Sequence, residues 1–483
     1  MTTKPKKALV ITASSTYKSR AEAVSKYLQK RGWETRIILP DFDHQAKEKR
    51  KQVQEGVQYL PMHPYKKNLS AARLYALSAF AKEAVKAANE QEPALLYVML
   101  PANSLGRAFS AYQTYHPTCR LVFDILDLWP ESLPIRYGKR LWPFSAWQAL
   151  RDKALPKADL IITECALFAK CLQEEKRIVP QISPAVVYWP NEIARPAWLK
   201  LKERDVQSKS AGMAAAKNMT ENPFLPKSVQ KESLKQEANL HVCYLGAINH
   251  IIDIKGIAKL LGALQKRLPV ICHIIGTGEN TARFSEALRA VQVCVVEEGA
   301  VYEAKQKQNI MRQCSFGLNM MKDTVCVGLT MKSVEYLACG LPLLNSIPGD
   351  TWELVEREGV GINIPAVWRS ERQAEKQKSR LRKKALEKLA AQGEKACKER
   401  ETGQANETGK GNRADKVRAI NRIAQAGEGE KSEEELLNRI LQMAASGMAL
   451  RRKARLIYEQ NFSEKAFAKQ MDAAFSGWER EQI

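Results

Sequence analysis

Long apolar runs are missing from this sequence of 483 residues. No run reaches the roughly 20 apolar residues that a helix needs to cross a bilayer. The first apolar run, Ala8-Leu-Val-Ile-Thr12, is too short for the core of a signal peptide, and no small-residue cleavage site follows it. We therefore expect a first β-strand in this run and a protein that stays in the cytoplasm.

Spacings typical of metal sites are also missing. None of the ten cysteines belongs to a C-x-x-C pair, and the six histidines show no paired spacing. Several cysteines lie inside strand-like apolar runs, as small buried side chains do in a reducing compartment. The sequence therefore predicts neither disulfides nor a structural metal.

Acidic residues are too few to balance the basic ones, and the formal net charge is +23. The basic residues do not alternate with aromatic ones in a stripe, and no nucleic-acid-binding signature is present. This charge favours an anionic membrane surface, or a lipid-linked diphosphate substrate at that surface, as the partner. A charge that serves only solubility is the alternative.

Short apolar runs alternate with amphipathic helical stretches over residues 1–201. A helix is expected at 18–30, where Ala21, Val24 and Leu28 share one face. Continuous apolar strands separated by helices indicate a parallel sheet that is covered on both faces. The strands are expected at 8–12, 35–39, 95–100, 121–125, 160–163 and 185–189.

The same alternation resumes over residues 239–366. Its strands are expected at 240–246, 270–275, 291–296, 316–320, 341–344 and 361–364. The predicted fold class is therefore α/β, with two Rossmann-like, doubly wound parallel-sheet domains that face each other across a cleft. This architecture alone does not select a ligand.

Two stretches interrupt the pattern. Residues 202–238 are rich in Lys, Ser, Gln, Asn and Ala, which predicts a linker or flexible insertion. Residues 367–431 are basic and of low complexity, which predicts a solvated insertion, with a membrane- or partner-binding arm as the alternative. Residues 432–483 are expected to form closing helices, with Ser463 as an N-cap.

The most informative segment covers residues 328–343. Thr330 suits an N-cap, an apolar stripe at helical spacing follows it, and Gly340 suits the helix end. Lys332 and Glu335 lie off this stripe. A helix N-terminus beside a lysine attracts a diphosphate, and a carboxylate one turn later accepts hydrogen bonds from sugar hydroxyls. The pattern favours a nucleotide-sugar site, and solvated charges at a helix end are the plainer alternative.

Two loops of the first unit place polar side chains after expected strands. In Phe123-Asp-Ile-Leu-Asp-Leu-Trp-Pro-Glu-Ser132, a strand ends in two carboxylates and an indole, which suit sugar hydroxyls and C–H faces. The segment 14–20 offers hydroxyls and a helix N-terminus. The residues expected to bind the acceptor or its sugar are Ser15, Thr16, Arg20, Asp127, Trp129 and Glu131. Asp127 is also expected to take the acceptor proton.

Two glycine turns of the second unit suit a diphosphate. The first follows Tyr244-Leu-Gly246, and Asn249 lies close behind it. The second contains Gly276 and Gly278, whose G-x-G spacing alone is equally typical of a tight strand-to-helix turn.

Taken together, these segments resemble the family-4 glycosyltransferases of GT-B fold, of the type that builds bacterial capsules and exopolysaccharides. The likeness also includes Pro101-Ala-Asn-Ser-Leu105, Val327-Gly-Leu-Thr-Met-Lys-Ser-Val-Glu335, Gly340-Leu-Pro342, Pro348-Gly-Asp-Thr-Trp352 and Ala454-Arg-Leu-Ile-Tyr458 with Phe462. It covers nearly the whole chain except 202–238 and 367–431.

The resemblance implies retaining transfer of a hexosyl group from a nucleotide-diphosphate sugar, without a cofactor or a required metal. We expect a UDP-sugar as donor and a lipid-linked or growing surface polysaccharide as acceptor, at the inner face of the plasma membrane, although the resemblance is not specific for either. The first domain would hold the acceptor and the second the donor, and the last helix would pack back on the first domain. Glu335 would bind the ribose, and Lys332 with N–H groups around Thr330 would neutralise the diphosphate.

The sequence departs from the family pattern at two positions. Val327 stands where the first acid of the E-x7-E motif is usual, and Ala247 stands where an arginine often follows the glycine turn, so that Lys255 is the expected substitute. A nucleotide-sugar epimerase that uses Asp127 and Glu131 as its acid/base pair is one alternative. A degenerate subunit that binds a nucleotide without turnover is the other.

Overall fold

The computed structural model describes residues 6–44, 46–50, 54–68, 70–133, 141–174, 183–199, 239–322, 325–365, 368 and 428–480. The predicted insertions at 202–238 and 367–431 lie outside these residues, apart from Trp368 and the start of the helix that begins at Glu428. Within the described residues, no helix is both long enough and apolar enough to span a membrane.

The first half of the chain forms a seven-stranded parallel sheet in the order β5-β2-β1-β6-β7-β8-β9. Continuous apolar runs build its central strands, which are buried on both faces, and this confirms the predicted doubly wound architecture. The strands are β1 (Lys7–Ile11), β2 (Glu34–Pro40), β5 (Val57–Leu60), β6 (Leu95–Leu100), β7 (Arg120–Ile125), β8 (Leu160–Thr163) and β9 (Ala185–Val186).

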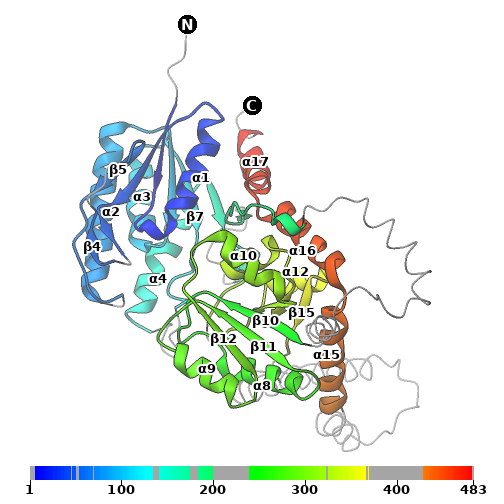
Figure 1. Cartoon of the computed structure of the whole chain (residues 1–483). Coiled ribbons are helices and arrows are strands. Elements are labelled where there is room, and N and C mark those ends of the chain that lie inside the picture. The colour runs from blue at the N-terminus through cyan, green and yellow to red at the C-terminus, as the bar shows by residue number, and fades with distance from the viewer. Residues whose placement is uncertain are drawn as a thin grey trace, which may run out of the picture.

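Helices cover both faces of this sheet (Figure 1). They are α1 (Lys18–Gln29), α2 (Ala71–Gln91), α3 (Asn103–Tyr115), α4 (Phe144–Asp152) and α5 (Ala166–Glu174). Short 3-10 turns occur at Ser15–Tyr17, Leu155–Lys157 and Ala197–Leu199. A small antiparallel hairpin of β3 (Phe42–Asp43) and β4 (Glu48–Lys49) follows β2.

The second sheet has six parallel strands in the order β12-β11-β10-β13-β14-β15. They are β10 (Leu240–Leu245), β11 (Val270–Ile275), β12 (Cys294–Gly299), β13 (Phe316–Asn319), β14 (Leu343–Asn345) and β15 (Gly361–Asn363). The helices are α8 (Ile254–Gln265), α9 (Thr281–Arg289), α10 (Ala304–Gln313), α11 (Met331–Ala338) and α12 (Asp350–Glu358). The strand predicted at 291–296 begins at Cys294, because the chain turns after α9 and Gln292 adopts a positive φ of 63°.

Three helices close the chain: α15 (Glu428–Ala444), α16 (Gly447–Asn461) and α17 (Glu464–Arg480). α16 packs on α11, where the Arg455 guanidinium donates to the Ala338 carbonyl at 2.7 Å. The Ser463 hydroxyl accepts the Ala466 N–H at 3.2 Å and caps α17. Phe467, Met471 and Phe475 of α17 then enter the core of the first sheet, so the last helix lies on the first unit (Figure 1).

Candidate functional site

The helix α11 begins as the sequence predicts, because Thr330 caps it. The Thr330 hydroxyl accepts the Ser333 N–H at 3.2 Å and donates to the Asn319 side-chain oxygen Oδ1 at 2.9 Å. Asn319 ends β13, so these bonds fix the helix N-terminus at the carboxyl edge of the second sheet. Gly340 follows the helix with a φ of 69°, a conformation that glycine adopts without strain.

Lys332 carries a charge that the protein does not balance. Its Nζ donates to the Tyr244 hydroxyl at 2.9 Å and lies 4.3 Å from the centre of the Tyr244 ring. No described carboxylate forms an ion pair with it, and burial lowers the pKa of the Lys332 amine to about 7. A partly buried amine whose partners are all neutral is arranged to receive an anion, which would favour its charged form.

Glu335 lies one turn further along α11 and already has a cationic partner. Its Oε1 accepts a hydrogen bond from the Lys307 ammonium of α10. Among the described residues, none donates to Oε2, and the side chains of Lys307 and Glu335 remain 19% and 22% exposed. One carboxylate oxygen therefore remains for a ligand hydroxyl.

The two predicted glycine turns lie against each other. The Gly246 N–H donates to the Ile275 carbonyl at 2.9 Å, and the Ile248 N–H donates to the Thr277 carbonyl at 3.1 Å. A Cβ on Gly276 would lie 2.2 Å from the Gly246 oxygen, and one on Gly278 would lie 2.4 Å from the Ile248 oxygen. Both positions therefore require glycine so that the loops after β10 and β11 can touch.

Asn249 and Lys255 lie further along the same loop and helix. The Asn249 side-chain oxygen accepts the Ile251 N–H at 3.2 Å, which closes a local turn. Lys255 is exposed in the first turn of α8 and forms no ion pair within the described part of the chain.

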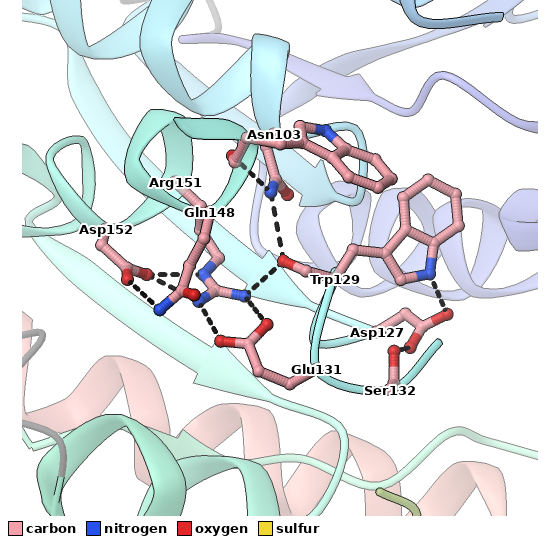
Figure 2. Close-up of polar contacts among 9 residues, drawn as sticks. Asn103, Asp127, Trp129, Glu131, Ser132, Gln148, Arg151 and Asp152 are labelled. Carbon is pink, nitrogen blue, oxygen red and sulfur yellow. Dashed lines mark hydrogen bonds and ion pairs between the residues drawn. The ribbon is translucent and has the colours of Figure 1, made fainter. Parts of the chain in front are cut away.

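In the first unit, the loop that follows β7 is braced from several sides (Figure 2). The Asp127 carboxylate accepts the Trp129 indole N–H at 2.6 Å and a hydrogen bond from the Ser132 hydroxyl. Asn103 and the buried Arg151 donate to the Trp129 carbonyl at 3.2 and 2.8 Å. Burial raises the pKa of the Asp127 carboxyl.

Glu131 and Asp127 have different hydrogen-bond partners. Its carboxylate receives two bonds from Arg151, at 2.9 and 3.1 Å, while Asp127 stays with Trp129 and Ser132 (Figure 2). Arg151 is completely buried and also contacts Asp152 at 2.6 Å. Glu131 therefore holds the loop to α4, whereas Asp127 braces the loop internally through Trp129 and Ser132.

The segment after β1 divides into surface and interior residues. The Ser15 hydroxyl donates to Asp43 at 3.4 Å, and Thr16 is exposed. Arg20 is fully buried, with bonds of 2.7 and 2.9 Å to Asp124 and one of 3.0 Å to the Val187 carbonyl. Its guanidinium lies inside the first unit and presents no surface to an acceptor, because it neutralises the buried Asp124.

Two acidic residues that the sequence did not single out lie close to this region. Glu164 leaves β8 beside the end of β7, where its N–H donates to the Ile125 carbonyl at 3.1 Å. Burial raises the pKa of the Glu164 carboxyl well above its usual value, and the charge of Asp127 adds to the effect. A polar residue directly after a buried strand is the signal that could have identified it.

Asp350 links the two units. Its carboxylate accepts the N–H groups of Ala166 and Leu167 at 2.7 and 2.9 Å, and the Tyr188 hydroxyl at 3.1 Å. An acid of α12 thus caps α5 of the other unit. The neighbouring Thr351 holds the Gly328 carbonyl at 2.8 Å, which places the loop before α11 at the same contact.

The chain matches no protein family model and no curated protein. It is similar to solved structures along nearly its whole length. Sucrose-phosphate synthase from Thermosynechococcus elongatus shares 11% identity over 99% of this chain and 100% of that one, with a TM-score of 0.59. Anabaena HepE in complex with UDP shares 12% identity over 98% and 100%, with a TM-score of 0.56.

A glycosyltransferase from Rickettsia africae shares 12% identity over 98% of this chain and 99% of that one, with a TM-score of 0.53. At identities this low, the similarity shows the fold alone. The structural match along nearly the whole chain confirms the prediction of two Rossmann-like domains in the GT-B arrangement.

Proposed function

We propose that this chain is a glycosyltransferase that moves a hexosyl group from a nucleotide-diphosphate sugar, preferably a UDP-sugar, to a lipid-linked or growing surface polysaccharide. The observation that carries the proposal is the uncompensated Lys332 at the N-terminus of α11, at the carboxyl edge of the second sheet. The similar Anabaena HepE has been solved with UDP and with UDP-glucose, which supports a donor of this class.

The proposed chemistry needs stabilisation of the departing nucleotide diphosphate. The Lys332 ammonium and the positive end of the α11 dipole would act on charge that develops as the sugar–phosphate bond breaks. Removal of one such group typically costs about 3 kcal/mol of barrier, or roughly a hundredfold in rate. Glu335 would hold the ribose hydroxyls through its remaining oxygen, with Lys307 fixing the carboxylate.

The first unit would bind the acceptor. Asp127, whose pKa is raised by burial, would take the proton of the attacking hydroxyl. Trp129 would pack on a C–H face of the acceptor sugar. We further propose family-4 membership, retention of configuration, independence of metal ions, and a cytoplasmic location with peripheral contact to an anionic membrane.

The first experiment incubates purified full-length protein with UDP-, GDP- and dTDP-sugars, with and without an extract of lipid-linked acceptors. A transferase releases nucleotide only as the sugar moves to acceptor or water. An epimerase would interconvert the sugar nucleotide without releasing nucleotide, and a non-catalytic subunit would bind it without any turnover.

The site assignment is tested with Lys332→Ala and Glu335→Ala, each expected to lose about a hundredfold in rate. Lys305→Ala is the matched control, since Lys305 is an exposed lysine in the first turn of α10. Full activity in both site variants would show that the donor binds elsewhere.

A further inference from the structure

A group of three basic side chains around a tyrosine lies at the carboxyl edge of the first sheet and has no role in the chemistry above. It consists of His44 and Lys47 in the β3–β4 hairpin, Tyr65 after β5, and Arg73 in the first turn of α2. The Tyr65 hydroxyl contacts the His44 Nδ1 at 2.7 Å, and the Lys47 ammonium lies 4.9 Å from the Tyr65 ring. We refer to these four residues as the basic cluster.

The protein offsets only part of the positive charge of this cluster: the nearby Asp43 carboxylate acts on His44 and Lys47 but forms its ion pair with Arg50, at 2.6 Å. Neither Lys47 nor Arg73 forms an ion pair within the described residues, and Lys47 donates instead to the Asn68 side-chain oxygen at 2.6 Å. The Arg73 Nε is buried and has no hydrogen-bond partner among the described residues. A buried donor on an unpaired cation is costly unless a ligand satisfies it.

The pKa values report the same excess of positive charge. Partial burial and the charges of Arg73 and Lys47 lower the pKa of His44 to about 4, although the charge of Asp43 acts in the opposite direction. Partial burial and Arg73 also lower the pKa of the Lys47 amine. An anion placed among these groups would relieve this mutual repulsion.

The position of Arg73 in its helix also indicates an anion-binding role. Ser70 caps α2 by accepting the Arg73 N–H at 3.2 Å, so Arg73 is the third residue of the helix. A cation there opposes the positive end of the helix dipole, where an acidic residue would stabilise the helix. The placement is unfavourable for the helix alone and favourable for binding an anion.

The basic cluster lies beside the proposed acceptor residues. The Arg73 guanidinium is 4.8 Å from the centre of the Trp129 ring, and its charge lowers the pKa of Asp127 against the raising effect of burial. An anion bound by Arg73 would therefore be next to a sugar stacked on Trp129. Phosphate esters attached directly to sugars have this arrangement of anion and ring.

We infer that the basic cluster binds a phosphate or diphosphate group of the acceptor, next to the sugar that receives the transfer. The inference builds on the proposed function, because it takes the first unit as the acceptor domain. It names the acceptor class as a phosphorylated one, whether the phosphate belongs to a sugar phosphate or to a lipid diphosphate.

The test uses full-length protein that carries Lys332→Gln, so that the proposed donor site binds the probes more weakly. Sodium pyrophosphate, glucose 1-phosphate and farnesyl diphosphate are titrated into it by calorimetry. Loss of one charged donor should weaken binding about tenfold or more, so we expect that effect when Arg73→Gln is added. Arg73→Lys should restore part of the affinity, and the tighter of the two organic probes identifies the source of the phosphate.

Arg107→Gln, an exposed arginine on α3, is the matched control and should leave all three affinities unchanged. Lys47→Gln is a second variant, on a different element, and thermal unfolding verifies that each variant folds. The inference is wrong if no probe binds more tightly to the parent than to both Arg73→Gln and Lys47→Gln. That outcome leaves the proposed function standing, since the latter depends on the separate Lys332→Ala assay.

Discussion

Lys332 combines burial with a neutral partner, and this has a measurable consequence for ligand binding. Its pKa of about 7 means that most molecules carry a neutral amine at pH 8 when the site is free. A bound diphosphate favours the ammonium and raises the pKa again. Binding of UDP-glucose at pH 8 should therefore take up close to one proton per site, and binding at pH 6 almost none.

Calorimetry in two buffers with different heats of ionisation measures this uptake. In Lys332→Arg the guanidinium is always charged, so the uptake should vanish. Equal binding heats in both buffers at pH 8 for the natural protein would contradict the prediction. In the free protein, the lowered pKa also makes the free energy of unfolding rise between pH 7 and about 10, because the unfolded chain then binds the extra proton.

Arg20 shows how burial turns a potential ligand-binding residue into a structural one. It forms a bidentate pair with Asp124, which also accepts the Tyr97 hydroxyl at 2.8 Å. Arg20→Met should destabilise the protein by about 3–5 kcal/mol, because Asp124 is left buried without a cation. Thermal unfolding detects the loss.

The double variant Arg20→Met with Asp124→Leu should recover most of that stability, since no uncompensated charge remains. A fall in acceptor affinity at unchanged stability would instead show that Arg20 acts on the acceptor.

At the scale of elements, local signals explain which parts of the fold and the site could be predicted. The cap at Thr330 and the apolar stripe behind it lie within nine residues, so the sequence alone defines α11 and places Lys332 at its start. The buried central strands were equally recognisable as apolar runs. β5 was missed because Val57-Gln-Tyr-Leu60 is short and only partly buried, as an edge strand allows.

Contacts between distant elements explain what could not be predicted. Arg20 meets Asp124 across 104 residues, and Glu131 meets Arg151 across 20. Neither partner can be chosen from the spacing of residues in one sequence. From the sequence, the side chains of Arg20 and Glu131 are both candidates to bind a ligand. In the structure, each forms an ion pair inside the first unit.

The cap of α5 by Asp350 is an element-scale contact with its own prediction. Asp350→Asn keeps the shape but leaves one oxygen to accept two N–H groups. We expect the midpoint of thermal unfolding to fall by about 1 °C, as for a loss near 1 kcal/mol in a chain of 483 residues. Glu353→Gln, an exposed acid in the same turn of α12, should change nothing. If Asp350→Asn and Glu353→Gln lowered the unfolding midpoint equally, the loss of a negative charge, and not the loss of the cap on α5, would explain the decrease.

At the scale of the whole molecule, the proposed transfer would require groups from two units to act on one bond. Lys332 and Glu335 belong to the second unit, and Asp127 to the first. The loop before α11 spans this boundary, because Cys326 and Leu329 pack against the core of the first unit. The same loop leads directly into Thr330 and the N-terminus of α11. Movement of one unit relative to the other should therefore displace the proposed diphosphate site.

Two thiols allow this coupling to be tested. The thiol of Cys326 lies close to that of Cys171 of α5, and both side chains are partly exposed. Oxidation by diamide, which takes one hydrogen from each thiol, should join them and fix the two units together. We expect the oxidised protein to keep its affinity for UDP-glucose but to lose turnover, because admission of acceptor and release of product need the units to separate. Reduction with dithiothreitol should restore the rate.

Peptide mapping by mass spectrometry identifies the cross-link, and Cys171→Ser should be resistant to diamide. Cys294→Ser is the control, since Cys294 is exposed on β12 and its removal should leave the inhibition unchanged. Full turnover by a protein whose Cys171 and Cys326 are linked would contradict this prediction. It would show that chemistry and product release proceed while the two units stay in the arrangement of this structure. In that case, acceptor and donor would have to enter without any separation of the two sheets, and Asp350 would serve stability alone.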